Sequence, residues 1–175
     1  MSPRRIGAVL ALVAAVMLLA GTFTMRWLTA PGGEEGGVGL TGVEMCRTRD
    51  GARACKTADW EEVTRGGHGT KVELVRKGSI GALVGSVAAA GLLVVVGVLA
   101  LGSRRSMSVV TIFSTLGAVA ALGGAIATVI LFRKYFREDS MAFGYSFYVY
   151  VAACALGAIG SIVARGGRGY ATPRG

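Results

Sequence analysis

Four uncharged runs constrain this 175-residue chain more than any other feature. They cover residues 6–25, 78–103, 106–132 and 140–164, and none contains Asp, Glu, Lys, Arg or His. An α-helix needs about 20 apolar residues to cross the roughly 30 Å hydrocarbon core of a bilayer. The composition agrees, because 53% of the residues are hydrophobic and the mean hydropathy is +0.58. The sequence therefore predicts an α-helical membrane protein with four spans.

These runs divide one domain, residues 1–175, into helices and loops. We expect the four spans at residues 6–28, 78–102, 107–132 and 142–164. The two loops on the extracytoplasmic side are expected at 29–77 and 133–141, and a cytoplasmic tail at 165–175. A cleaved signal peptide is the alternative interpretation of the first run. That run is longer than a usual signal core, and "AGTFTMRWL" offers no small-x-small cleavage site, so we expect a retained anchor.

The charge distribution predicts that both termini are cytoplasmic. Seven arginines and no acidic residue lie in the segments on the side of the termini, whereas all ten acidic residues lie on the other side. Six basic residues also border the spans on that acidic side, so the positive-inside rule favours this orientation only mildly. We expect a plasma membrane or bacterial inner membrane. The net charge of +9 then serves orientation and contact with anionic lipid, and no nucleic acid is expected as a partner.

The stretch "CRTRDGARAC" places a tight-turn signal midway between Cys46 and Cys55. Asp50-Gly51 is a favoured two-residue hairpin connection, and counting outward from it brings the two cysteines opposite each other. Alternation makes them a non-hydrogen-bonded pair, in which Cα atoms approach to roughly 4.5 Å, close enough for a disulfide. An extracytoplasmic loop supplies the oxidising surroundings that a disulfide needs. We therefore predict a Cys46–Cys55 disulfide.

The first loop contains further strand signals. "VGLTGVEMCR" and "RACKTADW" flank the turn, and "TKVELVRK" alternates polar and apolar residues as a half-buried strand does. The expected fold is a left-handed four-helix transmembrane bundle with a small antiparallel β-sheet formed by the first extracytoplasmic loop. So small a sheet has little core of its own, and a disulfide that closes about ten residues adds roughly 2.5–3 kcal/mol in the chain-entropy model.

The spans carry no sign of catalysis or transport. Carriers usually place ionisable groups or broken helices inside the membrane, and here the spans lack both ionisable residues and proline. No nucleophile–base or carboxylate pair supports an enzyme. His68, the only histidine, lies in "RGGHGT" without ligand partners. We expect no catalytic residue, cofactor, metal or small-molecule substrate.

Small and aromatic residues predict how the helices pack and where the membrane ends. Glycines at helical spacing allow close contact within the bundle or with a second protein, and Cys154 fits as a small packing residue. The glycines are Gly78, Gly81, Gly85, Gly117, Gly123, Gly124, Gly157 and Gly160. Aromatic rings concentrate at the membrane–water interface. The candidate interface aromatics are Trp27, Phe143, Tyr145, Phe147, Tyr148 and Tyr150.

The arrangement resembles the superfamily of claudins, peripheral myelin proteins and epithelial membrane proteins. The residues that carry the resemblance are the Trp27 that opens the loop, the Gly39-Leu40 pair, the Cys46…Cys55 pair and the basic Arg76 before the second span. Thr41 stands where that family has a second tryptophan. Arginine outnumbers lysine fifteen to four, which is typical of a GC-rich genome and indicates a bacterial relative.

Three functions follow as hypotheses, all without an enzyme. In the first, the disulfide-linked sheet mediates protein–protein contacts, by lateral self-assembly or by adhesion between cells or envelope layers. In the second, the chain is an accessory subunit of a larger channel, receptor or enzyme. In the third, it assembles into an oligomeric pore of the paracellular type. The expected partners are the lipid bilayer and either other membrane proteins or further copies of the chain.

Overall fold

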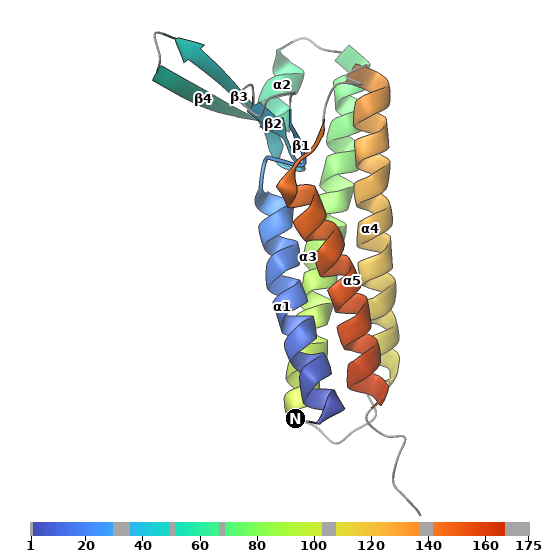
Figure 1. Ribbon diagram of the computed structural model, residues 1–175. Coiled ribbons are helices and arrows are strands. Elements are labelled where there is room, and N and C mark those ends of the chain that lie inside the picture. The colour runs from blue at the N-terminus through green and yellow to red at the C-terminus, as the bar shows by residue number, and fades with distance from the viewer. Residues whose placement is uncertain are drawn as a thin grey trace, which may run out of the picture.

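The computed structural model describes residues 2–29, 36–49, 52–66, 69–102, 108–136 and 142–166. Four long helices stand side by side, and a small sheet covers one end of the bundle (Figure 1). The helices are α1 (Pro3–Phe23), α3 (Gly69–Gly102), α4 (Ser108–Phe136) and α5 (Tyr145–Gly166). Each is long and apolar enough to cross a membrane, as predicted. The handedness of the bundle stays a prediction.

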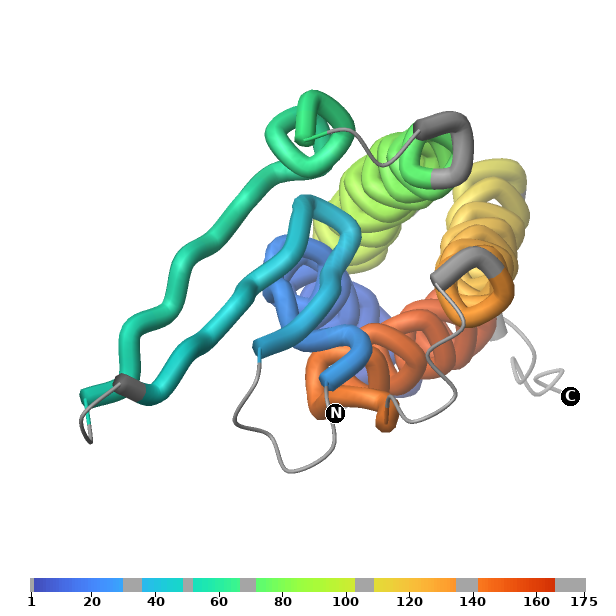
Figure 2. Tube along the Cα trace, turned by 90° about the horizontal axis from the view of Figure 1, so that it is seen from above, coloured from blue at the N-terminus to red at the C-terminus, as the bar shows by residue number. Residues whose placement is uncertain are grey.

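The helices form a closed ring in which α1 contacts α5 and α3, and α4 completes the ring between α3 and α5 (Figure 2). Alanines fill the α1 side of the core, with Ala8, Ala11 and Ala14 fully buried. The backbones of α1 and α5 approach closely, because a Cβ on Gly160 would lie 2.9 Å from the amide nitrogen of Ala11. Small residues at these positions therefore set the distance between the first and last helices.

The sheet is antiparallel throughout, in the order β4-β3-β2-β1-β5. Its strands are β1 (Leu28–Thr29), β2 (Gly36–Val38), β3 (Gly42–Arg49), β4 (Ala52–Asp59) and β5 (Ala142–Phe143). The register aligns Leu28, Val38, Val43 and Ala58 in one row across it. Residues directly opposite in an antiparallel sheet share a face, so this row places its side chains together against the ends of the helices.

One predicted strand is wrong. The segment "TKVELVRK", residues 70–77, belongs to α3, which begins at Gly69 rather than at residue 78. Alternation and helical periodicity coincide over so short a stretch, and the buried residues Val72, Val75 and Ser79 follow the helical spacing of three to four. An ion pair of 2.9 Å between Glu73 and Lys77 supports the same helix.

Two span boundaries and the origin of the sheet also differ from expectation. The helix predicted over 6–28 ends at Phe23, and the helix predicted from 142 begins at Tyr145. The residues left over form β1 and β5, which pair with each other through Leu28 and Phe143. The sheet is therefore not made by the first loop alone, because its last strand comes from the segment before α5.

Candidate interaction site

The hairpin formed by β3 and β4 has the predicted register. Cys46 lies opposite Cys55 with their Cα atoms 4.0 Å apart, and the two are joined by a disulfide. The last pair before the turn is Arg49 with Ala52, which leaves Asp50-Gly51 as the connection. Those two turn residues lie outside the described residues. The disulfide prediction is confirmed.

The hairpin reaches beyond the ring of helices (Figures 1 and 2). β4 is an edge strand, and of its eight residues only Ala58, near the bundle, is buried. Edge strands present unpaired backbone groups that can bind another chain, and charged side chains commonly limit such pairing. Arg53 and Lys56 supply those charges here. The hairpin is the part of the described chain that offers an exposed backbone edge away from the bundle.

The two faces of the hairpin differ. The face that continues the buried row carries Met45, Arg47, Ala54 and Lys56 beyond the edge of the bundle, and these four line a shallow hollow together with Cys55. Met45 is 52% exposed there. On the opposite face, Glu44 forms an ion pair of 3.4 Å with Arg26. The outer part of the first face is therefore apolar and basic.

Acidic residues gather at the other end of β4. Asp59, Glu61 and Glu62 are exposed where β4 passes into the short helix α2 (Trp60–Arg65). Asp59 caps α2 by accepting a 2.7 Å hydrogen bond from the Glu62 amide, which explains why the strand ends here. Arg53 and Asp59 are six residues apart, about 20 Å along an extended strand. Lys56 of β4 already forms an ion pair of 3.3 Å with Glu62, and Glu61 pairs with Arg65 of the same helix. Arg47 and Arg53, farther out on the hairpin, are separated from the acidic helix within one copy.

Two residues that carry the family resemblance lie at the junction of sheet and bundle. Trp27 is 2% exposed, its indole N–H donates a 2.6 Å hydrogen bond to the Gly21 carbonyl, and its ring centroid lies 4.7 Å from that of Tyr150. Gly39 passes so close to α1 that a Cβ there would lie 2.6 Å from the Thr24 carbonyl oxygen. Interface anchoring is therefore wrong for Trp27 and for the fully buried Tyr150, because both rings belong to the core.

Tyr150 instead joins three helices. Its hydroxyl lies 2.5 Å from the Ser86 hydroxyl of α3 and 3.1 Å from the Ala121 carbonyl oxygen of α4. These contacts satisfy polar groups that would otherwise be buried alone, which is costly in an apolar interior. Nothing in the sequence pattern separates this tyrosine from its exposed neighbours at 145 and 148.

The other predicted aromatics and Arg76 lie toward the outside. Phe143, Tyr145 and Tyr148 are exposed, and Phe147 is half-buried and stacks on Phe143 at 4.7 Å between centroids. The Arg133 guanidinium lies over the Phe143 ring at 4.6 Å. Arg76 is half-buried on α3. A role of these aromatics at a membrane interface stays a prediction.

Trp60 was not singled out by the sequence patterns, although it holds the loop between β2 and β3. It is buried, its indole N–H donates a 3.0 Å hydrogen bond to the Leu40 carbonyl, and its ring meets Phe132 edge-on at 6.3 Å. Thr41, the position of the family's second tryptophan, has no ring, so Trp60 is the tryptophan beside Leu40. The acidic residues at 59 and 62 have the spacing of a capping box and are the signal that predicts a helix at Trp60.

The glycines of the helices fall into two groups. Gly157 and Gly160 face tight contacts within the bundle, whereas a Cβ added at Gly81, Gly85 or Gly123 would meet no described atom within 4 Å. The second group leaves small residues on the outer surfaces of α3 and α4. Only part of the predicted small-residue pattern therefore serves contacts inside this chain.

Potential metal ligands do not form a usable set among the described residues. The ligand atoms of Glu44, Cys46 and Cys55 lie within 4.8 Å of one another, but the two sulfurs are bonded to each other. Thiolates are the form of cysteine that binds metals, so this group lacks two of its three ligands. His68 lies outside the described residues.

The fold and the site together define a chain of four long apolar helices closed at one end by a disulfide-linked antiparallel sheet. No known family model matches the sequence, and no curated protein matches it. The resemblance to the claudin superfamily therefore stays a prediction.

Proposed function

We propose that this chain is a non-enzymatic four-span protein of a cell membrane, with both termini cytoplasmic and the sheet outside. The outer surfaces of the helices support insertion, because large apolar side chains are exposed along α3 and α4, where lipid would cover them. Examples that are about 60% exposed are Val84, Val98, Leu116, Val119 and Ile130.

We infer that the sheet mediates protein–protein contacts, and the projecting hairpin is the observation that carries this inference. A loop that only connected two helices would not need a covalently linked hairpin that extends past the bundle. A rigid hairpin loses little conformational freedom when it binds, which favours its use as a contact surface.

Lateral self-assembly is the mode that the charges favour. Arg47, in the outer part of the hairpin, and Glu61, on α2 beyond the other end of β4, carry complementary charges. Glu61 pairs with Arg65 within its own helix through an exposed ion pair, which is weak enough to exchange partners. The hairpin of one copy can therefore approach α2 of a second copy. Such a heterologous contact leaves one hairpin and one α2 unoccupied in every pair of copies. Further copies can therefore add to form rows, or the assembly can close into a ring.

A charge-swap experiment tests this mode. Fluorescently labelled copies of the full chain in lipid vesicles should transfer energy to one another. Arg47→Glu should weaken association by about 5-fold, as expected for roughly 1 kcal/mol, and Glu61→Arg should weaken it similarly. Combining both substitutions should restore association, because the pair is rebuilt with its signs exchanged.

Lys134→Glu is the matched control, because Lys134 is an exposed basic residue at the same end of the bundle but on α4. It should leave association unchanged. Monomeric wild-type protein, or a double variant as weak as the single ones, would contradict lateral assembly through these two surfaces.

An accessory subunit is the second candidate function, and the open glycines favour it. Gly81 and Gly85 on α3 and Gly123 on α4 leave room for a foreign helix to approach closely in lipid. Gly123→Leu should then abolish recovery with one unrelated membrane protein while leaving energy transfer between copies intact. The opposite result, with transfer lost and recovery kept, would assign the open face to self-assembly.

A further inference from the structure

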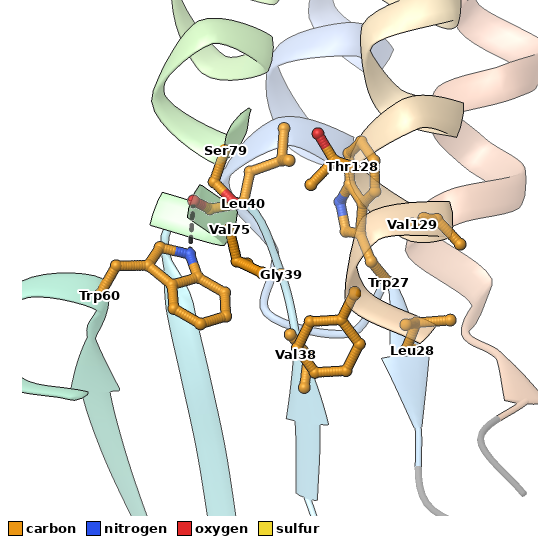
Figure 3. Close-up of a pocket in the computed structure, with 11 residues that line it drawn as sticks. Trp27, Leu28, Val38, Gly39, Leu40, Trp60, Val75, Ser79, Thr128 and Val129 are labelled. Atoms are coloured by element: carbon orange, nitrogen blue, oxygen red, sulfur yellow. Dashed lines mark hydrogen bonds between the residues drawn. The ribbon is translucent and has the colours of Figure 1, made fainter. Parts of the chain in front are cut away.

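A small cavity lies where the sheet meets the ends of α3 and α4, and all the residues that line it are buried (Figure 3). Its walls are mostly apolar, with the two indoles of Trp27 and Trp60 among them. The cavity measures about 20 Å³. A cavity needs roughly 10–15 Å³ to hold one water molecule, so this space is large enough for one water molecule.

Polar groups from three parts of the chain line the same space. Ser79 of α3 is fully buried, and its hydroxyl has no hydrogen-bond partner in the described part of the chain. The Thr128 hydroxyl of α4 donates to the Gly124 carbonyl at 2.9 Å and keeps its lone pairs. The Leu40 carbonyl accepts from Trp60 and keeps a second lone pair. Figure 3 shows Ser79 and Thr128 on the helix side of the cavity.

We propose that one ordered water molecule occupies this cavity and bridges Ser79 to the Leu40 carbonyl and the Thr128 hydroxyl. The water accepts a hydrogen bond from the Ser79 hydroxyl, which lacks any other partner in the described part of the chain, and donates one hydrogen to the Leu40 carbonyl and the other to the Thr128 hydroxyl oxygen. A dry cavity would leave a buried hydroxyl unpaired, which is unfavourable. A lipid tail would satisfy no polar group and needs more room than a single water does.

The bridge has a structural consequence that does not depend on the proposed function. It connects α3 and α4 to the loop between β2 and β3, next to the Trp60 hydrogen bond that already fixes Leu40. The water thereby links the sheet to the bundle through hydrogen bonds. Buried waters of this kind are costly to remove, because they satisfy several groups at once.

Paired serine substitutions in the full-length protein test the proposal. Ser79→Ala removes the donor at the cavity and should lower the thermal midpoint in detergent micelles by about 2–4 °C. Ser146→Ala is the control, because the Ser146 hydroxyl is also buried without a described partner but does not line the cavity. Its removal should leave the midpoint unchanged or raise it.

A crystal structure at a resolution that shows other buried waters provides the second measurement. We expect one compact density feature within hydrogen-bonding distance of the Ser79 oxygen, and none in Ser79→Ala. An empty cavity, an elongated density of the kind a lipid tail gives, or a Ser79→Ala midpoint at or above that of the wild type would each overturn the proposal.

Discussion

Removing the disulfide should open the hairpin and leave the helix bundle intact. The bond between Cys46 and Cys55 closes a loop of about ten residues, for which the chain-entropy model gives roughly 2.7 kcal/mol. Because each 1.4 kcal/mol is a factor of ten, replacing both cysteines with serine should raise the open population of the hairpin about 100-fold. The four helices satisfy their own backbone hydrogen bonds, so they should be unaffected.

Hydrogen exchange followed by mass spectrometry measures both parts of this prediction in one sample. Amides of β3 and β4 should exchange about 100-fold faster in the double-serine variant, and trypsin should cleave the hairpin correspondingly faster at Arg47, Arg53 and Lys56. Amides in α1 and α5 should keep their protection. Thr57→Ala, an exposed change on β4 that keeps the disulfide, should alter exchange only slightly.

Two results would refute this reasoning. Unchanged hairpin protection would mean that side-chain contacts, and not the disulfide, maintain the register. Lost protection throughout the bundle would mean that the sheet stabilises the helices. A peptide map of the non-reduced protein comes first, because free thiols at Cys46 and Cys55, or bonds between chains, would remove the premise.

Three further outcomes are expected. A membrane-impermeant thiol reagent on intact cells should label a cysteine at Gly66 but not one at Arg165, and the reverse labelling would invert the topology. Gly160→Leu should lower the thermal midpoint, because the added side chain meets the α1 backbone, whereas Gly123→Leu faces open space and should not lower it. Equal effects of the two substitutions would contradict the close packing of α5 against α1. Tyr150→Phe should destabilise the bundle by about 1–2 kcal/mol in reversible unfolding, and a neutral effect would show that its hydroxyl contacts contribute nothing.

The helices and the hairpin could be predicted because their signals are local. Long uncharged runs report the helices directly, and the Asp-Gly turn fixes which residues of β3 and β4 stand opposite each other. The boundaries were less accurate, because Leu28 and Phe143 are as compatible with an apolar helix as with a strand. Their pairing joins segments 115 residues apart, which a pattern read over a few residues does not detect.

The junction between sheet and bundle was the least predictable part. Trp27 and Tyr150 are aromatic residues near the ends of apolar runs, as interface residues are. Only their contacts with α1, α3 and α4 show that they belong to the core. The unpaired hydroxyl of Ser79 likewise depends on which residues surround it. Sequence patterns report how often a residue is apolar or polar at a given spacing, but they do not report what fills the space beside it.

The pairing of the two ends of the chain has a consequence for synthesis. α1 packs against α3 and α5, and β1 pairs with β2 and β5, so the contacts of α1 and β1 are completed only when residues 142–166 have been made. Until then the face of α1 that meets α5, around Gly7 and Ala11, stays uncovered. A chain that stops before residue 142 would keep the whole hairpin with its disulfide, yet it would lack the helix and the strand that complete the ring.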